Sequence, residues 1–324
     1  MNTYIPLPNS GAGSPVQFSE PAAYSYESCH CCPRNCQINR TKKQGWCHSP
    51  AGIRAARAAL HPWEEPCISG LHGSGTIFFS GCTLRCCFCQ NHDIAIGSRG
   101  RAVSVERLGE IFLELKEKGA ANINLVTGAH YVPQIIEALD MARRNGLDIP
   151  VVYNSSGYEK TETLKLLEGY VDIYLPDLKY LDPELAQKFS YAPDYVQAAK
   201  AAIGEMVRQT GKCEFGEDGY IRKGTIVRHL ILPGHTGNSI KALRYLHETY
   251  GEDIYISIMN QYTPVRKFVE FKELNRKVTK REYEKVLDAA VDMGIQNGFI
   301  QEGETASESF IPDFDYEGVE KNTP

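Results

Sequence analysis

The sequence predicts an α/β protein built around a mainly parallel sheet. From Ser74 onward, short runs of β-branched or aromatic residues alternate with amphipathic helical segments. Polar residues follow each of these runs. An alternation of this length implies right-handed crossovers between parallel strands, in a doubly wound open sheet or in a complete or partial barrel.

Seven strands are expected, each a short run of residues that favour extended structure. They cover residues 76–80, 122–126, 149–153, 171–175, 225–232, 255–259 and 298–301.

Three of the intervening helices have recognisable ends. Ser104 can cap a helix that ends at Gly119, and a second helix ends at Gly146. Thr279 opens a capping box for a third helix, which ends at Gly294.

Polar side chains gather directly after every expected strand. Because the carboxyl ends of parallel strands meet at one edge, the chemistry of such folds collects there. In chain order, the strands are followed by the cysteines of 82–89, by residues 127–130, 154–157, 176–179, 233–235 and 261–262, and by Glu302.

Composition excludes several classes of protein. The 324 residues are 42% hydrophobic, which is enough for a large core, and the net charge of -5 argues against a nucleic-acid partner or an anionic membrane surface. No apolar run approaches the length of a membrane span. Residues 1–10 contain no basic residue and do not resemble a secretory signal, so we expect a cytoplasmic protein.

The chain divides into four segments by composition. We expect an irregular leader at 1–28, a cysteine-rich region at 29–73 that includes a possible second metal site, the α/β body at 74–302 and a tail at 303–324.

Eleven cysteines are unusual for a cytoplasmic chain, and ten of them lie between Cys29 and Cys89. A secreted disulfide framework, a metal or cluster protein and scattered buried thiols are the three alternatives. In a reducing compartment, clustered cysteines bind metal more often than they pair with each other.

The loop after the first expected strand holds Cys82, Cys86 and Cys89 in CxxxCxxC spacing. Three thiolates on one short loop can bind three corners of a 4Fe-4S cluster and leave one iron open to a substrate. The alternative is a zinc knuckle, which needs a fourth ligand at Cys87 or His92 on the same short loop. Cys87 itself is most simply a small buried apolar residue.

A second group of cysteines precedes the α/β body. Cys29, Cys32, Cys36 and Cys47 can close a four-thiolate metal site, and such a shell serves a second 4Fe-4S cluster or a structural zinc equally well. The alternative is that these residues are unligated thiols, as Cys31 would be in either case.

The motif of Cys82, Cys86 and Cys89, with Phe88 before the last cysteine, resembles the signature of the radical S-adenosylmethionine superfamily. Further stretches resemble a branch related to pyruvate formate-lyase activating enzyme, and the likeness spans about residues 29–315. These stretches are residues 61–70, 78–82, 89–91, 152–159, 172–180, 227–234 and 261–264.

This resemblance implies a partial (β/α)6, TIM-like barrel as the radical SAM core. It also implies a 4Fe-4S cluster whose open iron binds the amino and carboxylate groups of S-adenosylmethionine. One electron, from a donor such as flavodoxin or ferredoxin, then cleaves the sulfonium to a 5'-deoxyadenosyl radical, which abstracts hydrogen from the substrate. In activating enzymes, that hydrogen comes from a glycine of a partner glycyl-radical enzyme.

The resemblance also suggests which residues hold the cofactor. Asp177 and Lys179 match an Asp-x-Lys that contacts a monovalent cation and the cofactor carboxylate, although a solvated ion pair would look the same in sequence. The remaining candidates for cofactor or cation binding are Thr127, His130, Asn154, Ser155, Arg228, Gln261 and Tyr262.

Three of these positions depart from the family pattern. Residues 127–130 replace a Gly-Gly-Glu segment, so His130 is either a cofactor contact or simply a residue at a helix start. Asn154 replaces an aspartate, which weakens a cation site by one charge, and Gln261 with Tyr262 replaces a Tyr-His pair.

Three functions therefore remain open from the sequence. The protein activates a glycyl-radical enzyme, or it applies the same radical chemistry to a small molecule or a peptide. The third alternative is a non-catalytic iron-sulfur or zinc protein, but an electron carrier needs no ring of polar strand ends.

Overall fold

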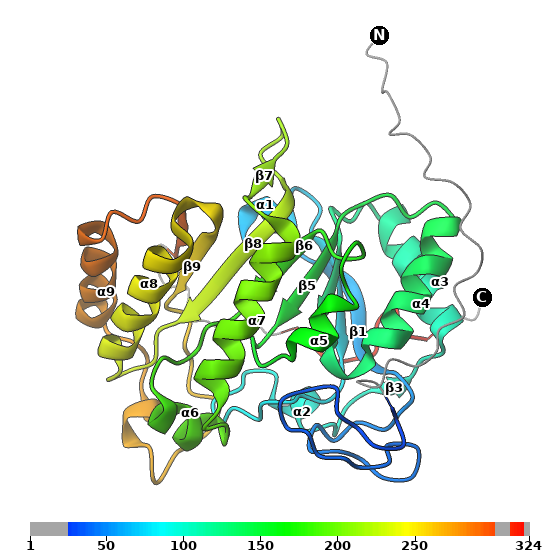
Figure 1. Ribbon diagram of the computed structural model, residues 1–324, viewed down its shortest axis with the longest axis horizontal. Helices are drawn as coiled ribbons and strands as arrows, with labels where there is room; N and C mark the ends of the chain where they lie inside the picture. Colours follow the sequence, from blue (N-terminus) through cyan, green and yellow to red (C-terminus); the bar gives the residue numbers. More distant parts are fainter. Residues whose placement is uncertain (1–24, 302–311, 321–324) are drawn as a thin grey trace.

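The computed structural model describes residues 25–301 and 312–320 (Figure 1). Most of the expected leader, Glu302 and parts of the expected tail lie outside these ranges. The described strands form one sheet in the order β10-β9-β8-β6-β5-β4-β2-β1-β3, and β7 pairs with β8 off this path. Because the order begins and ends on different strands, the sheet is open, as in a partial barrel.

All seven expected strands are confirmed, and neighbouring members run parallel. Their observed ends differ from the expected ones by a few residues at most. They are β2 (Ser74–Phe79), β4 (Ile123–Val126), β5 (Val151–Ser155), β6 (Ile173–Pro176), β8 (Ile221–Leu230), β9 (Tyr255–Met259) and β10 (Gly298–Ile300).

Three further strands were not expected from the sequence. The strand β1 (Arg54–His61) pairs antiparallel with β2, and β3 (Arg101–Ala102) pairs antiparallel with β1. The short β7 (Glu214–Phe215) pairs antiparallel with β8. The sequence of β1 is rich in alanine and has no β-branched residue, so its extended form depends on pairing with β2 and not on local propensity.

The helices lie mainly along one face of the sheet (Figure 1). The three with predicted ends are confirmed: the Ser104 side chain caps the first, Thr279 forms the capping box of the third, and glycines with positive φ follow all three. The helices are α1 (Pro66–Ser69), α2 (His92–Ala95), α3 (Val105–Glu117), α4 (Val132–Arg144), α5 (Thr161–Lys165), α6 (Pro183–Ser190), α7 (Tyr195–Thr210), α8 (Thr236–Tyr250) and α9 (Lys280–Asp292), with 3-10 turns η1 (Ala129–Tyr131), η2 (Gly251–Asp253) and η3 (Lys272–Asn275).

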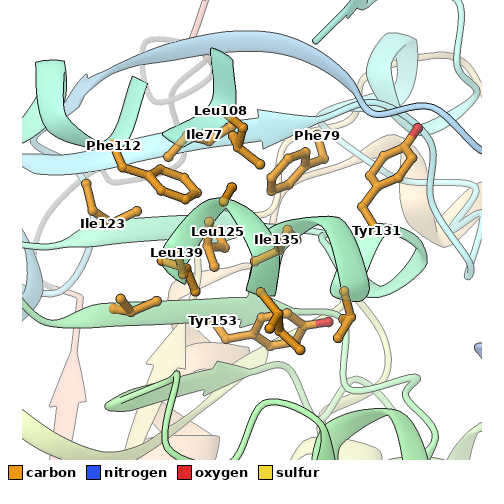
Figure 2. Close-up of a cluster of buried hydrophobic side chains, with 14 of the residues drawn as sticks. Ile77, Phe79, Leu108, Phe112, Ile123, Leu125, Tyr131, Ile135, Leu139 and Tyr153 are labelled. Carbon is orange, nitrogen blue, oxygen red and sulfur yellow. The ribbon is translucent and has the colours of Figure 1, made fainter. Parts of the chain in front are cut away.

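The main core lies between the sheet and helices α3 and α4 (Figure 2). Ile77 of β2 and Leu125 of β4 belong to this core together with Phe112 of α3. Because side chains alternate along a strand, the intervening Thr76 and Asn124 face the other side of the sheet, where they are also fully buried. The inner face of the barrel is therefore polar in part.

Two segments outside the helices complete the body. Residues 312–320 run beside β1, where the Tyr316 N–H donates to the Ala56 carbonyl oxygen and the Ala58 N–H donates to the Glu317 carbonyl oxygen. Residues 25–53 form irregular loops beside α2, near the carboxyl ends of the parallel strands (Figure 1). Across the described ranges, no helix is long and apolar enough to cross a membrane.

Candidate active site

A cavity of about 440 Å³ opens at the carboxyl ends of the parallel strands. It is lined by residues of the loop 81–91, by the segment 61–66 and by residues at the strand ends. Most candidates from the sequence share this cavity. They are Cys82, Cys86, Cys89, Thr127, Asn154, Ser155, Asp177, Lys179, Arg228, Gln261 and Tyr262.

The three cysteines of the motif lie together in the loop after β2. The loop turns at Gly81, whose φ is +92°, and the Cys89 N–H donates to the Cys86 carbonyl oxygen at 3.1 Å. The Ser190 hydroxyl donates a hydrogen bond of 3.1 Å to Sγ of Cys86. Cys87 does not line the cavity and is buried in the apolar core beside α6.

The donor set of this loop fits a cluster better than a single ion. Burial raises the pKa of Cys86 to about 11 and also raises the pKa of Cys89, so both thiols need a nearby cation to lose their protons. Three thiols of the loop, those of Cys82, Cys86 and Cys89, line the cavity, and Cys87 does not. A 4Fe-4S cluster spreads its ligands over several irons, whereas a zinc ion needs four ligands around one point.

Asp177 and Lys179 form an ion pair at the end of β6. Lys179 Nζ lies 2.5 Å from Asp177 Oδ2, and the two side chains are only 16% and 22% exposed, so the pair is not a solvated one. Burial opposes the charge of Lys179, but the Asp177 carboxylate raises the pKa of Lys179 above its usual value. The ammonium group therefore stays charged, and it lines the cavity beside the cysteine loop.

The ends of β4 and β5 supply smaller polar groups to the cavity. Thr127 has a φ of +60°, and its N–H donates to the Asn154 carbonyl oxygen at 2.9 Å. The Ser155 hydroxyl accepts from the Gly157 N–H at 3.1 Å. These bonds hold both strand ends in place while their side chains remain at the cavity wall.

His130 lies behind the cavity and does not line it. Its ring is fully buried, with Nε2 2.9 Å from the Ser80 carbonyl oxygen. Burial lowers the pKa of His130 to about 3, so the ring is neutral at physiological pH. Because a carbonyl oxygen only accepts, Nε2 carries the proton and donates to the residue two positions before Cys82.

Sequence reasoning missed a charged group on the inner side of the cavity. Glu64 and Glu65 both pair with the Arg228 guanidinium, and all three side chains are at most 12% exposed. Burial opposes ionisation of Glu65, but Arg228 lowers its pKa below the usual value. Glu64 also accepts hydrogen bonds from the side chains of Asn124, at 2.8 Å, and Asn154.

Arg228 lines the cavity as expected. Its guanidinium is, however, paired with two carboxylates of the protein. The two adjacent glutamates between Pro62 and Pro66 were the available signal. Their role could not be derived, because only the folded chain places that segment under the strand ends.

Gln261 and Tyr262 follow β9 at the cavity wall. The Gln261 carbonyl oxygen accepts from the Gln90 side chain at 3.1 Å, and its Oε1 accepts from the Gln301 side chain at 2.9 Å. The Tyr262 hydroxyl donates to the Leu274 carbonyl oxygen at 2.7 Å. Gln261 thus links the cysteine loop to the residue that follows β10. The Tyr262 hydroxyl is hydrogen-bonded within the protein.

The four amino-terminal cysteines lie outside the cavity. Cys29, Cys32 and Cys47 are buried, Cys36 is half-buried, and none of the described cysteines forms a disulfide. The Cys47 carbonyl oxygen accepts from the Cys82 N–H at 3.2 Å. The cysteine-rich region is therefore in direct contact with the loop of the first motif.

Comparison with known proteins bears on this geometry. The profile of the Radical SAM superfamily matches residues 76–246, which is just over half of the chain. An uncharacterized protein of Methanocaldococcus jannaschii is 28% identical over 272 residues, covering 82% of this chain and 75% of that protein.

Two solved structures are similar to this chain at low identity. SuiB of Streptococcus suis bound to S-adenosylmethionine is 16% identical with a TM-score of 0.44, over 68% of this chain and 48% of SuiB, so this chain spans about half the length of SuiB. A domain of pyruvate-formate lyase-activating enzyme from Bacteroides vulgatus is 12% identical with a TM-score of 0.37, over 53% of this chain and 92% of that domain.

Proposed function

Since the chain belongs to the radical SAM superfamily, we propose that Cys82, Cys86 and Cys89 hold its 4Fe-4S cluster and that it activates a partner glycyl-radical enzyme. When bound, the cluster and S-adenosylmethionine supply a 5'-deoxyadenosyl radical that abstracts hydrogen from the substrate. The observation that supports the assignment is the position of the three thiols, which share one cavity with a half-buried ion pair at the end of β6.

The polar groups of the cavity would position the methionyl part of S-adenosylmethionine. The Lys179 ammonium can pair with its carboxylate, while Asp177 can accept from its amino group or hold a monovalent cation. The Asn154 carbonyl and the Ser155 hydroxyl are neutral oxygen ligands for the same cation. Thr127 and Gln261 offer hydrogen bonds further along the wall.

The apolar side chains of the cavity would keep water away from the radical. Phe88, Leu230 and Met259 line the same space as the cysteines. A dry site matters because water and other hydrogen donors divert reactive intermediates. The proposal also includes a second metal site at Cys29, Cys32, Cys36 and Cys47.

The charged group around Arg228 favours a second candidate, a small molecule or peptide that carries a cation. Two buried carboxylates share one guanidinium, so this side of the cavity has an excess negative charge. A glycine backbone brings no charge to balance it, whereas an amine or a guanidinium does.

The first experiment tests the radical chemistry before the substrate. The protein is reconstituted with iron and sulfide without oxygen, mixed with S-adenosylmethionine and dithionite, and assayed for 5'-deoxyadenosine. Absence of product from protein that holds a full cluster would contradict the proposal.

A second experiment separates the two substrates. The reduced enzyme is incubated with a candidate glycyl-radical enzyme encoded near its gene, and the glycyl radical is measured by electron paramagnetic resonance. A radical on the partner supports activation. Product formation that depends on a lysine- or arginine-containing peptide, without a glycyl radical, would favour the second candidate.

A further inference from the structure

The amino-terminal cysteines are gathered by a tight turn. The Cys29 N–H donates to the Ile38 carbonyl oxygen at 3.1 Å, and the Gln37 N–H donates back to the Cys29 carbonyl oxygen at 2.9 Å. Inside this pair of bonds, the Asn35 N–H donates to the Cys32 carbonyl oxygen at 3.0 Å. The chain therefore folds back on itself between Cys29 and Ile38, with Cys32 and Cys36 in the bend.

Cys47 lies next to Cys36, at Gly45. A Cβ on Gly45 would stand 3.4 Å from Sγ of Cys36 and 3.6 Å from Sγ of Cys47, so both thiols face one small space beside the glycine. Cys29, Cys32 and Cys47 are each at most 7% exposed. The group is therefore a largely dry pocket of sulfur atoms.

A buried cation stands beside Cys31, whose Sγ lies 3.2 Å from Sγ of Cys29 in this group. Arg40 is 1% exposed, and its guanidinium donates to the carbonyl oxygens of Pro50, at 2.6 Å, and His130, at 2.7 Å. Its other hydrogen bonds in the described chain reach the Ser49 carbonyl oxygen and Sγ of Cys31, so no carboxylate is among its partners. A buried guanidinium is costly without a negative charge nearby, and a set of metal-bound thiolates carries such a charge.

The turn is also packed against the loop of the catalytic cysteines. A Cβ on Gly81 would stand 2.5 Å from the Cys47 carbonyl oxygen, so no side chain fits between the two segments. Arg34, which lies between Cys32 and Cys36, donates to the carbonyl oxygens of Thr83 and Leu84 at 2.9 and 3.0 Å. A metal group held by the turn would thus lie next to the cavity.

We propose that Cys29, Cys32, Cys36 and Cys47 hold a second 4Fe-4S cluster, with Arg40 as its counter-charge, and that this cluster relays electrons to the cavity. In each passage it accepts one electron from a flavin or iron-sulfur donor protein and gives that electron to the catalytic cluster. No bond forms or breaks at the turn, and no proton moves there. Zinc could not serve this role, because it has no redox chemistry.

The relay role rests on the proposed function, but the metal content of the turn does not. The full chain carrying Cys82→Ala, Cys86→Ala and Cys89→Ala is reconstituted without oxygen and analysed for iron, sulfide and zinc. We expect about four irons and four sulfides per chain. Because four protein ligands close the shell, the spectrum of the reduced cluster should not change when S-adenosylmethionine is added. One zinc, or no metal, would overturn the proposal.

The same triple variant separates this proposal from the proposed function. Retention of four irons in the variant, with no 5'-deoxyadenosine from the wild-type protein, would support the second cluster and contradict the radical chemistry. Cleavage of S-adenosylmethionine by the wild-type protein, with no iron in the variant, would support the radical chemistry and contradict the second cluster.

Single variants in the triple-variant background identify the ligands. Cys32→Ala and Cys36→Ala should each lose most of the remaining iron. The distant Cys213→Ala is the control that should keep it, and Cys31, whose Sγ lies 3.2 Å from Sγ of Cys29, is the alternative ligand. Loss of iron in Cys31→Ala with retention in Cys32→Ala would overturn the ligand set.

The relay is tested by two reductants with the catalytic loop intact. Dithionite can reduce either cluster directly, whereas a donor protein depends on the relay. In a Cys32→Ala/Cys36→Ala variant, the ratio of flavodoxin-driven to dithionite-driven cleavage should fall at least tenfold. An unchanged ratio would overturn the relay role.

Arg40 is tested by the reduction potential of the second cluster in the triple-variant background. Arg40→Gln should lower that potential, because a nearby cation favours the more negative reduced state. Arg40→Lys keeps the charge and should restore most of the shift, which separates charge from packing. Equal potentials in all three proteins would overturn the assignment of Arg40.

Discussion

The Ser190 hydroxyl lies 3.1 Å from Sγ of Cys86 and donates a hydrogen bond to it. Ser190 is fully buried at the end of α6, and its oxygen is also 2.7 Å from the Tyr180 hydroxyl. Hydrogen bonds to ligand sulfurs stabilise the reduced form of an iron-sulfur cluster. Through this contact, a residue at the end of α6 should affect the reduction potential of a cluster held by the cysteine loop.

Ser190→Ala should lower the reduction potential of the catalytic cluster by about 20 to 60 mV. This range follows from about 0.5–1.5 kcal/mol for one hydrogen bond and about 59 mV per tenfold change for one electron. The measurement is an anaerobic redox titration followed by electron paramagnetic resonance. Tyr180→Phe, which leaves the Ser190–Cys86 bond in place, should shift the potential less. An equal shift in both variants would mean that the bond to sulfur is not the cause.

Single replacement of Cys82, Cys86 or Cys89 by alanine should abolish formation of 5'-deoxyadenosine, because each removes one of three ligands. Cys87→Ala is the matched control on the same loop, since its side chain packs in the core beside α6. It should retain cleavage, with a modest loss of stability from the missing sulfur atom. Full cleavage by Cys86→Ala combined with loss in Cys87→Ala would show that a different set of cysteines binds the cluster.

Lys179→Met should weaken binding of S-adenosylmethionine by about 1–3 kcal/mol while the iron content stays at the wild-type level, because a charged hydrogen bond is lost. Asp177→Asn should have a smaller effect on binding, since the amide still offers an oxygen. Equilibrium binding to the reconstituted protein measures both. Lys188→Met is the control, because Lys188 is exposed, pairs with Glu273 and does not line the cavity. Wild-type affinity in both Lys179→Met and Asp177→Asn would remove this pair from the cofactor site.

Arg228→Met should destabilise the protein by about 3–5 kcal/mol, because it leaves two buried carboxylates without their cation. The free energy of unfolding is measured by anaerobic denaturant titration. Adding Glu64→Gln and Glu65→Gln to this variant should recover part of the loss, since the amides carry no charge. A triple variant less stable than Arg228→Met would contradict the charge argument.

Glu159 should make stability fall as the pH rises from about 4.5 to 8. Burial raises the pKa of this carboxyl to about 8, and its described partners are the Ser155 and Tyr153 hydroxyls, not a cation. Between its ordinary pKa and 8 the folded protein binds a proton that the unfolded chain has lost, so each pH unit costs up to about 1.4 kcal/mol. Glu159→Gln removes this dependence and should be the more stable protein at pH 8.

The window from pH 6.5 to 8 isolates the effect of Glu159. Burial lowers the pKa of His130 to about 3 and that of His229 to about 4, so these residues cost stability only below their ordinary pKa near 6.5. Unfolding curves for the wild-type protein and Glu159→Gln are compared across this window. Parallel pH profiles would show that Glu159 is already ionised in the folded protein.

Local signals in the sequence predicted most of the sheet. The parallel strands are short runs of β-forming residues, and β2, β4 and β6 are buried on both faces, so in these three propensity and burial favour the same structure. The antiparallel β1 was missed because its alanines carry no such signal. Its strand form comes from pairing with β2, a contact that no local pattern records.

The candidate site was predictable where spacing along the chain fixes geometry. Three cysteines within eight residues of one loop must lie close together, and strand ends in a parallel sheet must share an edge. His130 shows the limit of this reasoning, because it follows β4 as expected but turns behind the cavity toward Ser80. The direction of such a side chain changes when the helical turn begins one residue earlier or later. No local pattern in the sequence specifies the residue at which this turn begins.

By itself, the sequence determined the α/β alternation, the order of the strands along the chain and the cysteine loop, because these depend on periodicity and on separations of a few residues. Tertiary structure alone decided that Glu64 and Glu65 would meet Arg228, more than 160 residues away, and that Cys47 would lie against Cys82. Such contacts form when separate elements pack to bury charge and apolar surface together, so they depend on the whole fold and leave no local trace in the chain.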